Sequence, residues 1–134
     1  MAVNFGVNYL AIVVAAVVAI VIGFVFFAPQ TLGSRWTAYG IPAPPARPAP
    51  TTFVVGLLAA LINAWVLAVL ALNLRGSTVA DGIMLGILVW LGFMATLTAA
   101  EGAFQGRPWA PWFINNAHHV IVQVLMGAIV TAWH

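Results

Sequence analysis

Several polar side chains stand inside long apolar stretches of this sequence, and they are the residues whose types suit chemistry. The main candidates are Asn63, Glu101, Asn115, His119 and Gln123. A carboxylate and an imidazole are the groups that proton or ion relays use. Polar residues inside a membrane are costly unless they form bonds or carry out a function. We therefore treat these five residues as one predicted intramembrane polar cluster.

The spacing of the last three predicts how the cluster is arranged. Asn115, His119 and Gln123 are four residues apart and would form one stripe on a helix. His118 would point about 100° away, so we expect His119 to face the helix bundle and His118 to point elsewhere. Glu101 should face inward and bond to Arg107, as an ion pair, or to the stripe. Asn116 is a further candidate, and Thr96 and Thr98 are weaker ones.

Several kinds of site remain open for these residues. The cluster could relay protons or ions, or it could be a hydrogen-bonded group that fixes how the helices pack. His118 or His119 could instead bind haem or another tetrapyrrole pigment, because neutral imidazole ligates the metal of such groups. One acid and one usable histidine are too few for a metal site. No paired carboxylates or catalytic triad occur in a usable place, so we expect no enzyme activity and predict no cofactor.

The composition excludes most other classes of protein. Of 134 residues, 64% are hydrophobic and 4% are charged, against about 25% charged in soluble domains. Too few charges remain to cover a surface in water, and disordered chains are poor in apolar residues. A net charge of +2 is too small for a nucleic-acid surface. Without cysteine, disulfide and thiolate chemistry are absent. The chain is therefore predicted to be an integral membrane protein.

Four apolar stretches are long enough to cross a bilayer, which takes about 20 helical residues. They cover about residues 8–27, 52–74, 79–103 and 111–133. The runs are apolar throughout, whereas the strands of a membrane barrel alternate. We therefore predict an all-α fold, a four-helix transmembrane bundle that forms a single domain over residues 1–134.

The connection over residues 28–50 is the longest loop. Leu32, Trp36 and Tyr39 have helical spacing, which predicts a short helix at the membrane interface. Residues 41–50 contain five prolines and should form an extended polyproline strap.

The arginines predict the orientation of the bundle. Arg35, Arg47 and Arg107 fall on one side of the membrane, and Arg75 falls on the side of the two termini. Because cytoplasmic loops carry the excess of basic residues, both termini are predicted to lie on the non-cytoplasmic side.

Small residues at four-residue spacing predict where helices approach one another closely, either inside the bundle or, for one helix face, against another subunit. They are Ala15, Ala19 and Gly23 in the first span, Gly56 and Ala60 in the second, and Gly82 and Gly86 in the third. Two tryptophans, Trp65 and Trp90, fall in mid-membrane. We expect at least one of them to face another helix, a subunit or a cofactor, because a buried indole N–H needs a partner.

Short motifs along most of the chain resemble a bacterial membrane-protein family, domain of unknown function 1761. They are Asn8-Tyr9-Leu10-Ala11, residues 23–29, Gly33 with Trp36, Asp81-Gly82, Leu91-Gly92-Phe93, Glu101-Gly102, Asn115 with His119, and Met126-Gly127-Ala128. The proline-rich strap departs from the family pattern. The resemblance implies a four-helix membrane protein and brings no established activity.

We therefore expect a small multi-pass protein of a bacterial inner membrane, surrounded by lipid. Its short loops suit an accessory or structural subunit of a larger membrane assembly, or a homo-oligomer. A small transporter or channel built on Glu101, Asn115 and His119 is the first alternative. A pigment-binding subunit is the second.

Overall fold

The computed structural model describes residues 1–28, 31, 33–41, 47 and 49–134, and no strand occurs in these ranges. The elements are α1 (Tyr9–Phe26), α2 (Gly33–Ala38), α3 (Pro50–Asn73), α4 (Val79–Val89), the π-helical segment η1 (Trp90–Ala95), α5 (Thr96–Phe104) and α6 (Trp109–Ala132). The elements α4, η1 and α5 form one continuous span, Val79–Phe104. Four helices are thus long and apolar enough to cross a membrane, and none of their ends lies more than two residues from its predicted position.

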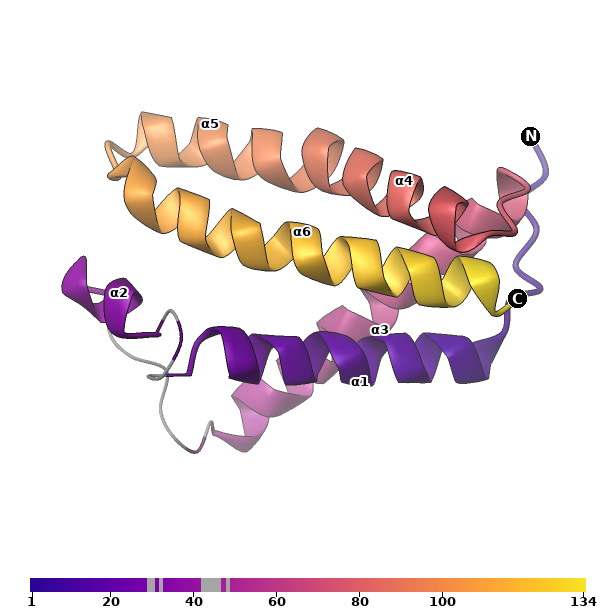
Figure 1. Cartoon of the computed structure of the whole chain (residues 1–134), viewed down its shortest axis with the longest axis horizontal. Coiled ribbons are helices and arrows are strands. Elements are labelled where there is room, and N and C mark those ends of the chain that lie inside the picture. The colour runs from indigo at the N-terminus through magenta and orange to yellow at the C-terminus, as the bar shows by residue number, and fades with distance from the viewer. Residues whose placement is uncertain (29–30, 32, 42–46, 48) are drawn as a thin grey trace.

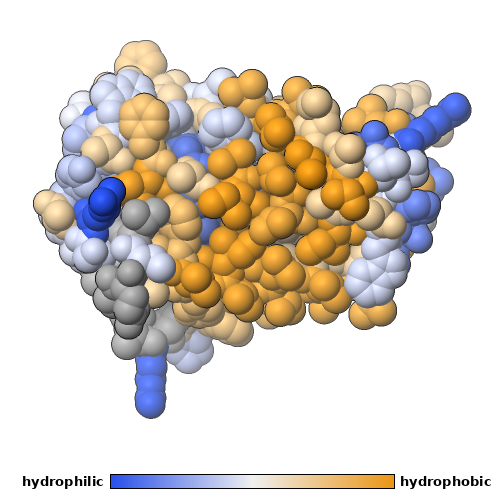
Figure 2. All heavy atoms as spheres, viewed as in Figure 1, coloured by the Kyte–Doolittle hydropathy of each residue, from blue (hydrophilic) through white to orange (hydrophobic). Residues whose placement is uncertain are grey.

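The four long helices form a bundle with both chain termini at the same end (Figure 1). The short helix α2 and the turn between α5 and α6 lie at the opposite end, which we call the arginine end because it carries Arg35 and Arg107. Apolar side chains cover the middle of the face seen in Figure 2, and hydrophilic ones gather toward the two ends. This is the distribution that a bilayer-spanning protein needs.

Local hydrogen bonds define where the helices begin and end. The Asn8 side chain accepts hydrogen bonds from the backbone of Leu10 and Ala11 and caps α1. Thr78 and Asp81 form a reciprocal capping box at the start of α4. The turns after α3 and α5 contain the positive-φ residues Arg75 and Gly106, which let the chain reverse after each helix.

Glycines allow α4 and α6 to touch backbone to backbone. A Cβ atom added at Gly82 would lie 2.7 Å from the Cα atom of Ala128, and one added at Gly86 would lie 2.8 Å from that of Val124. A Cβ atom added at Gly127 of α6 would in turn meet the carbonyl oxygen of Gly82. Close approach of this kind is how small residues hold membrane helices together, so Gly82 and Gly86 pack within the chain.

The other predicted packing residues divide into two groups. Ala15 is fully buried in the core, beside Ala64, Leu67 and Met126. Ala19 packs against this core, and Gly23 lies beside the ring of His118. Ala60 is partly buried, but Gly56 is exposed, with no atom within 4 Å of an added Cβ. Gly56 therefore does not pack inside the bundle, because the first half of α3 leaves its neighbours (Figure 1), and its contact with another subunit stays a prediction.

An N-terminal segment, residues 1–8, folds back over the end of α3. The Asn73 side chain accepts a 2.9 Å hydrogen bond from the backbone N–H of Asn4 and donates one of 2.9 Å to its carbonyl. The ring of Phe5 stacks on Trp65, with centroids 5.7 Å apart and planes at 6°. The sequence pattern did not indicate this contact, because the segment is neither apolar enough nor long enough to form a span.

The predicted interfacial helix is present as α2. Its Trp36 packs edge to face on Phe27, with ring centroids 5.5 Å apart. Gly33 is buried against the carbonyl oxygens of Phe27 and Ala28, where a side chain would not fit. Most of the predicted polyproline strap, residues 42–46 and 48, lies outside the described residues.

Candidate functional site

A polar network joins the third and fourth spans inside the bundle, and Asn116 is its centre. Trp90 donates a 3.1 Å hydrogen bond from Nε1 to Oδ1 of Asn116. Asn116 donates from Nδ2 to Oγ1 of Thr98 (3.2 Å) and to the carbonyl oxygen of Trp112 (3.1 Å). Trp112 donates from Nε1 to the same hydroxyl of Thr98 at 3.0 Å. Asn116 is only 3% exposed, so these bonds satisfy a buried amide that would otherwise be costly.

The π-helical segment η1 lets residues of the third span face α6 in this network. Trp90 begins the segment and Thr98 follows its end by three residues. In a regular helix, residues eight apart are about 80° out of line. A π-helical turn takes in one extra residue, which brings such a pair back to within about 20°. The hydroxyl of Thr98 also donates to the carbonyl oxygen of Met94 within the segment, at 2.7 Å.

Gln123 lies deeper in the same interface. It is fully buried, and its Nε2 atom lies 3.2 Å from the sulfur of Met94. Its Oε1 atom is buried with no hydrogen-bond partner among the described residues. Gln123 therefore belongs to the intramembrane polar group, as predicted, but bonds to the third span rather than to His119.

The predicted stripe of Asn115, His119 and Gln123 does not form one bonded group. The face of α6 that meets the third span carries Asn116 and Gln123, so α6 is turned from the predicted orientation by about 50°, half of the angle of about 100° between adjacent residues. Asn115 points into a cavity described below. His119 is partly buried beside His118, with ring centroids 5.4 Å apart. Asn63 is partly buried in the middle of α3 and lines no part of that cavity.

His118, which was predicted to point away from the bundle, packs against α1. Its ring centroid lies 5.4 Å from that of Phe26 and 5.1 Å from that of Phe27. Both ring nitrogens are buried, and neither has a hydrogen-bond partner among the described residues. A tetrapyrrole bound to His118 would have to displace these aromatic rings. Within the described ranges, no three His, Cys, Asp or Glu side chains gather as a metal site would require.

Glu101 does not form the predicted bond to Arg107 or to the stripe of α6. Its side chain is exposed and accepts a 3.2 Å hydrogen bond from Nε2 of Gln105, one turn further along the chain. No ion pair joins Glu101 to Arg107 in the part of the chain that the structure describes. The physical reason is that an exposed carboxylate gains little from an ion pair in water, and Glu101 bonds instead to Gln105, the residue that caps the end of α5.

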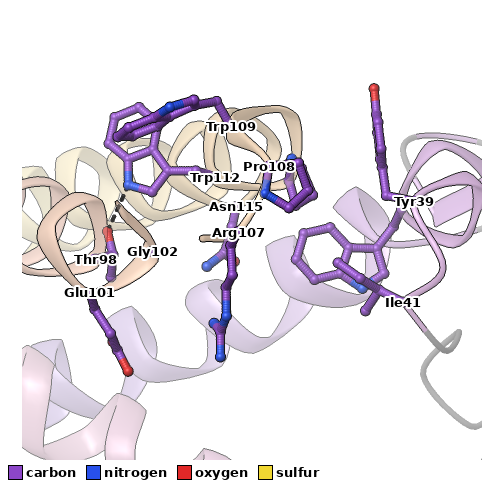
Figure 3. A pocket seen from close by; sticks show the side chains of 12 residues that line it. Tyr39, Ile41, Thr98, Glu101, Gly102, Arg107, Pro108, Trp109, Trp112 and Asn115 are labelled. Atoms are coloured by element: carbon purple, nitrogen blue, oxygen red, sulfur yellow. Dashed lines mark hydrogen bonds between the residues drawn. The ribbon is translucent and has the colours of Figure 1, made fainter. Parts of the chain in front are cut away.

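The charged groups Glu101 and Arg107 instead line a common cavity of about 610 Å³ at the arginine end of the bundle. Figure 3 shows both side chains, with Asn115 and Thr98, in the wall that α5, α6 and the turn between them contribute. Aromatic residues from two elements complete the lining, among them Trp36 of α2 and Trp112 of α6. The bond between Trp112 and Thr98 places the polar network directly beside the cavity (Figure 3). We call this space the interfacial cavity.

The two tryptophans predicted to need partners both have them. Trp90 bonds to Asn116 of another helix, which confirms the expectation, and Trp65 stacks on Phe5. The role of Asn116 was missed because it adjoins Asn115, and only the rotation of the helix distinguishes the two. Thr98 and Trp90, eight residues apart, could not be paired with one amide without knowledge of the π-helical segment.

Comparison with known proteins gives one match. A family model described as a protein of unknown function, DUF1761, matches residues 10–131. No curated protein and no solved structure matches the chain. The family match covers all four spans, the polar network and most of the interfacial cavity. The chain therefore belongs to the DUF1761 family.

Proposed function

We propose that this protein is a structural or accessory subunit that works by packing against other membrane-spanning chains, in a bacterial inner membrane. The observation that carries the proposal is the first half of α3, residues 50–61, in which no residue is buried. Val55 and Leu58 are 61% and 52% exposed there, and a Cβ at Gly56 would meet nothing within 4 Å. A small residue on an open apolar face lets a second helix approach closely.

The rest of the molecule supports a role in packing rather than in catalysis. The described residues outside the four spans form short turns, the N-terminal segment and the six-residue helix α2. Within the described residues, these segments form no separate catalytic or sensing domain. The proposal therefore assigns the protein no enzyme activity, and its partner is either a second copy or a different membrane subunit.

Site-directed crosslinking tests the proposal directly, because the chain has no native cysteine. A cysteine replacing Val55, on the open face of α3, should crosslink in native membranes to another copy or to a copurifying subunit. A cysteine replacing Val21, which is 53% exposed on α1, is the matched control and should stay monomeric. Equal crosslinking of the two variants, or of neither, would contradict the proposal.

A small transporter or channel is the second candidate, and the interfacial cavity favours it. Its carboxylate, guanidinium and amide groups could receive a polar solute from one side of the membrane. The fully buried side chains of Leu67, Gln123 and Met126 fill the bundle below, so transport would need these helices to separate. Replacing Glu101 by Gln in proteoliposomes should then abolish solute flux while the protein stays folded. Unchanged flux would exclude a path through this carboxylate.

A further inference from the structure

We propose that the interfacial cavity binds the zwitterionic headgroup of a membrane lipid, of the aminoalkyl-phosphate type found in phosphatidylethanolamine. Arg107 would take the phosphate, and Glu101 would accept the ammonium N–H groups. The inference does not depend on the packing role proposed above. It rests on the charges in the cavity, on its aromatic lining and on how far it lies from the end of the third span.

The charges in the cavity match such a headgroup. Glu101 and Arg107 are the charged side chains among its lining residues, and they are of opposite sign. Within the described part of the chain they form no ion pair with each other, and Glu101 is bonded to Gln105 alone. A carboxylate and a guanidinium that share a cavity without pairing can each receive the opposite charge of one ligand. Guanidinium binds phosphate oxygens with two parallel N–H bonds, and a carboxylate accepts readily from an ammonium group.

The depth of the cavity points to a lipid as the source of that headgroup. Glu101 lies three residues before the end of the third span at Phe104, which is about 4.5 Å along a helix axis. Trp36, Tyr39 and Trp109 belong to the same lining, and such rings favour the headgroup level of a bilayer. The cavity therefore lies where lipid headgroups do, and its volume of about 610 Å³ is typical of a site for one small ligand.

The aromatic and polar walls distinguish between headgroups. The indole of Trp112 is held in place by its bond to Thr98, so the wall beside Glu101 is ordered before any ligand arrives. A primary ammonium can donate N–H bonds to the Glu101 carboxylate, whereas a choline group has no N–H to donate. A lipid with a purely anionic headgroup would place negative charge against Glu101. The cavity should thus prefer an ethanolamine headgroup over both choline and glycerol headgroups.

Lipid competition by native mass spectrometry tests this on the purified, delipidated protein. Phosphatidylethanolamine, phosphatidylcholine and phosphatidylglycerol with identical acyl chains are offered together, and free aminoethyl phosphate is added in a separate arm. We expect one phosphatidylethanolamine per protein, retained about tenfold more than either competitor, the scale of one charged hydrogen bond. Equal retention of the three lipids would overturn the proposal. Displacement by equimolar aminoethyl phosphate would show that the site takes a free solute instead of a lipid.

Two variants and a control assign the charges. Arg107→Gln should lower retention of phosphatidylethanolamine and phosphatidylcholine alike by about tenfold. Glu101→Gln should leave phosphatidylcholine unchanged and remove the preference for phosphatidylethanolamine. Arg35→Gln removes an exposed arginine at the same end of the bundle but outside the cavity lining, and it should change neither. If Arg35→Gln reduces retention as much as Arg107→Gln does, the binding is nonspecific and the proposal fails.

A defect in folding cannot be mistaken for a loss of binding in this design. Glu101 and Arg107 are both exposed, so the thermal unfolding of their variants in detergent should match that of the original protein. Arg107→Lys keeps the charge and loses the paired N–H geometry, so it should retain more lipid than Arg107→Gln. The competition among headgroups on the unaltered protein decides the question independently of every variant.

Discussion

Asn116 shows how one amide can hold two membrane helices together. Its Oδ1 atom accepts from Trp90 of the third span, and its Nδ2 atom donates to Thr98 of that span and to the carbonyl of Trp112 on its own helix. An amide has two donor hydrogens and an acceptor oxygen, and here all of them are used. The neighbouring Asn115 has the same chemistry but only lines the interfacial cavity.

This difference predicts unequal effects of the same substitution at adjacent positions. Asn116→Ala leaves the N–H of Trp90 without its acceptor and removes one of the two donors to the hydroxyl of Thr98, and should destabilise the folded protein by about 1–2 kcal/mol. Asn115→Ala, the control, should change the free energy of unfolding by less than about 0.5 kcal/mol. Equilibrium unfolding in mixed micelles measures both. Similar losses for the two variants would mean that the network contributes nothing beyond ordinary packing.

The polar residues could be found from the sequence, but their pairing could not. Polar groups in apolar stretches stand out in any chain, and Gln123 and Asn116 are indeed buried. Which of two adjacent residues faces a neighbour depends on helix rotation, and one residue changes the direction by about 100°. This is why Asn115 was favoured over Asn116, and His119 over His118. The predicted ion pair between Glu101 and Arg107 is absent for another reason: two residues that are close in the sequence need not point their side chains toward each other.

Among the helices, the third span and α6 pack most closely at one end and separate at the other. At the end near the termini, Gly82 and Gly86 meet the α6 backbone. At the arginine end, α5 has no buried residue and borders the interfacial cavity. The glycine contacts thus provide the close approach, and the cavity lies where that approach ends.

Two glycines of the third span should therefore respond very differently to a larger side chain. Gly86→Leu forces the backbones of α4 and α6 apart and should cost about 3 kcal/mol or more of stability. Gly92→Leu is the matched control, because nothing lies within 4 Å of its added Cβ, and it should cost less than about 1 kcal/mol. Thermal unfolding in detergent compares them. A Gly86→Leu protein as stable as Gly92→Leu would show that the observed contact is not needed.

The N-terminal segment gives a second prediction among the elements. Asn73→Ala removes both hydrogen bonds to the backbone of Asn4, so residues 1–8 should exchange their amide hydrogens faster and the stacking of Phe5 on Trp65 should loosen. Hydrogen exchange and tryptophan fluorescence report these changes. Asn4→Ala is the comparison variant: it keeps both bonds between Asn73 and the backbone of residue 4 and removes only the 2.9 Å bond that the Gly6 N–H donates to Oδ1 of Asn4, so it should speed exchange at Gly6 alone. Equal exchange in the two variants would contradict the role of Asn73.

The four spans were predictable because long apolar runs and their polar or proline-rich ends are local features of the sequence. Proline at residues 50 and 108, asparagine at residue 8 and threonine at residue 78 stand at the observed helix starts. The π-helical segment was not predictable, because it depends on contacts between Trp90, Thr98 and another helix. The divergence of α3 at Gly56 was missed for the same reason: small residues show where close packing is allowed, not where it occurs.

The whole molecule has unlike ends, and this asymmetry bears on how it sits in a membrane. The arginine end carries Arg35, Arg47 and Arg107, and the end with both termini carries Arg75. The interfacial cavity also lies at the arginine end. If basic loops stay in the cytoplasm, the cavity faces the cytoplasmic leaflet and meets the lipids of that leaflet.

This orientation can be measured with single cysteines, because none occurs naturally in the chain. Ser34 lies in α2 at the arginine end, and Ser77 lies in the turn between α3 and α4 at the other end; both are exposed. In intact spheroplasts, a membrane-impermeant maleimide should label Ser77→Cys and leave Ser34→Cys unlabelled until the cells are lysed. Labelling of Ser34→Cys in intact spheroplasts would show that the protein has the opposite topology.

Replacing Arg35, Arg47 and Arg107 by Gln leaves Arg75 as the remaining basic residue, so the excess of positive charge moves to the end with the termini. If arginines set the orientation, that variant should show the opposite labelling pattern, at least in part of the population, whereas an unchanged pattern would mean that the apolar segments determine it.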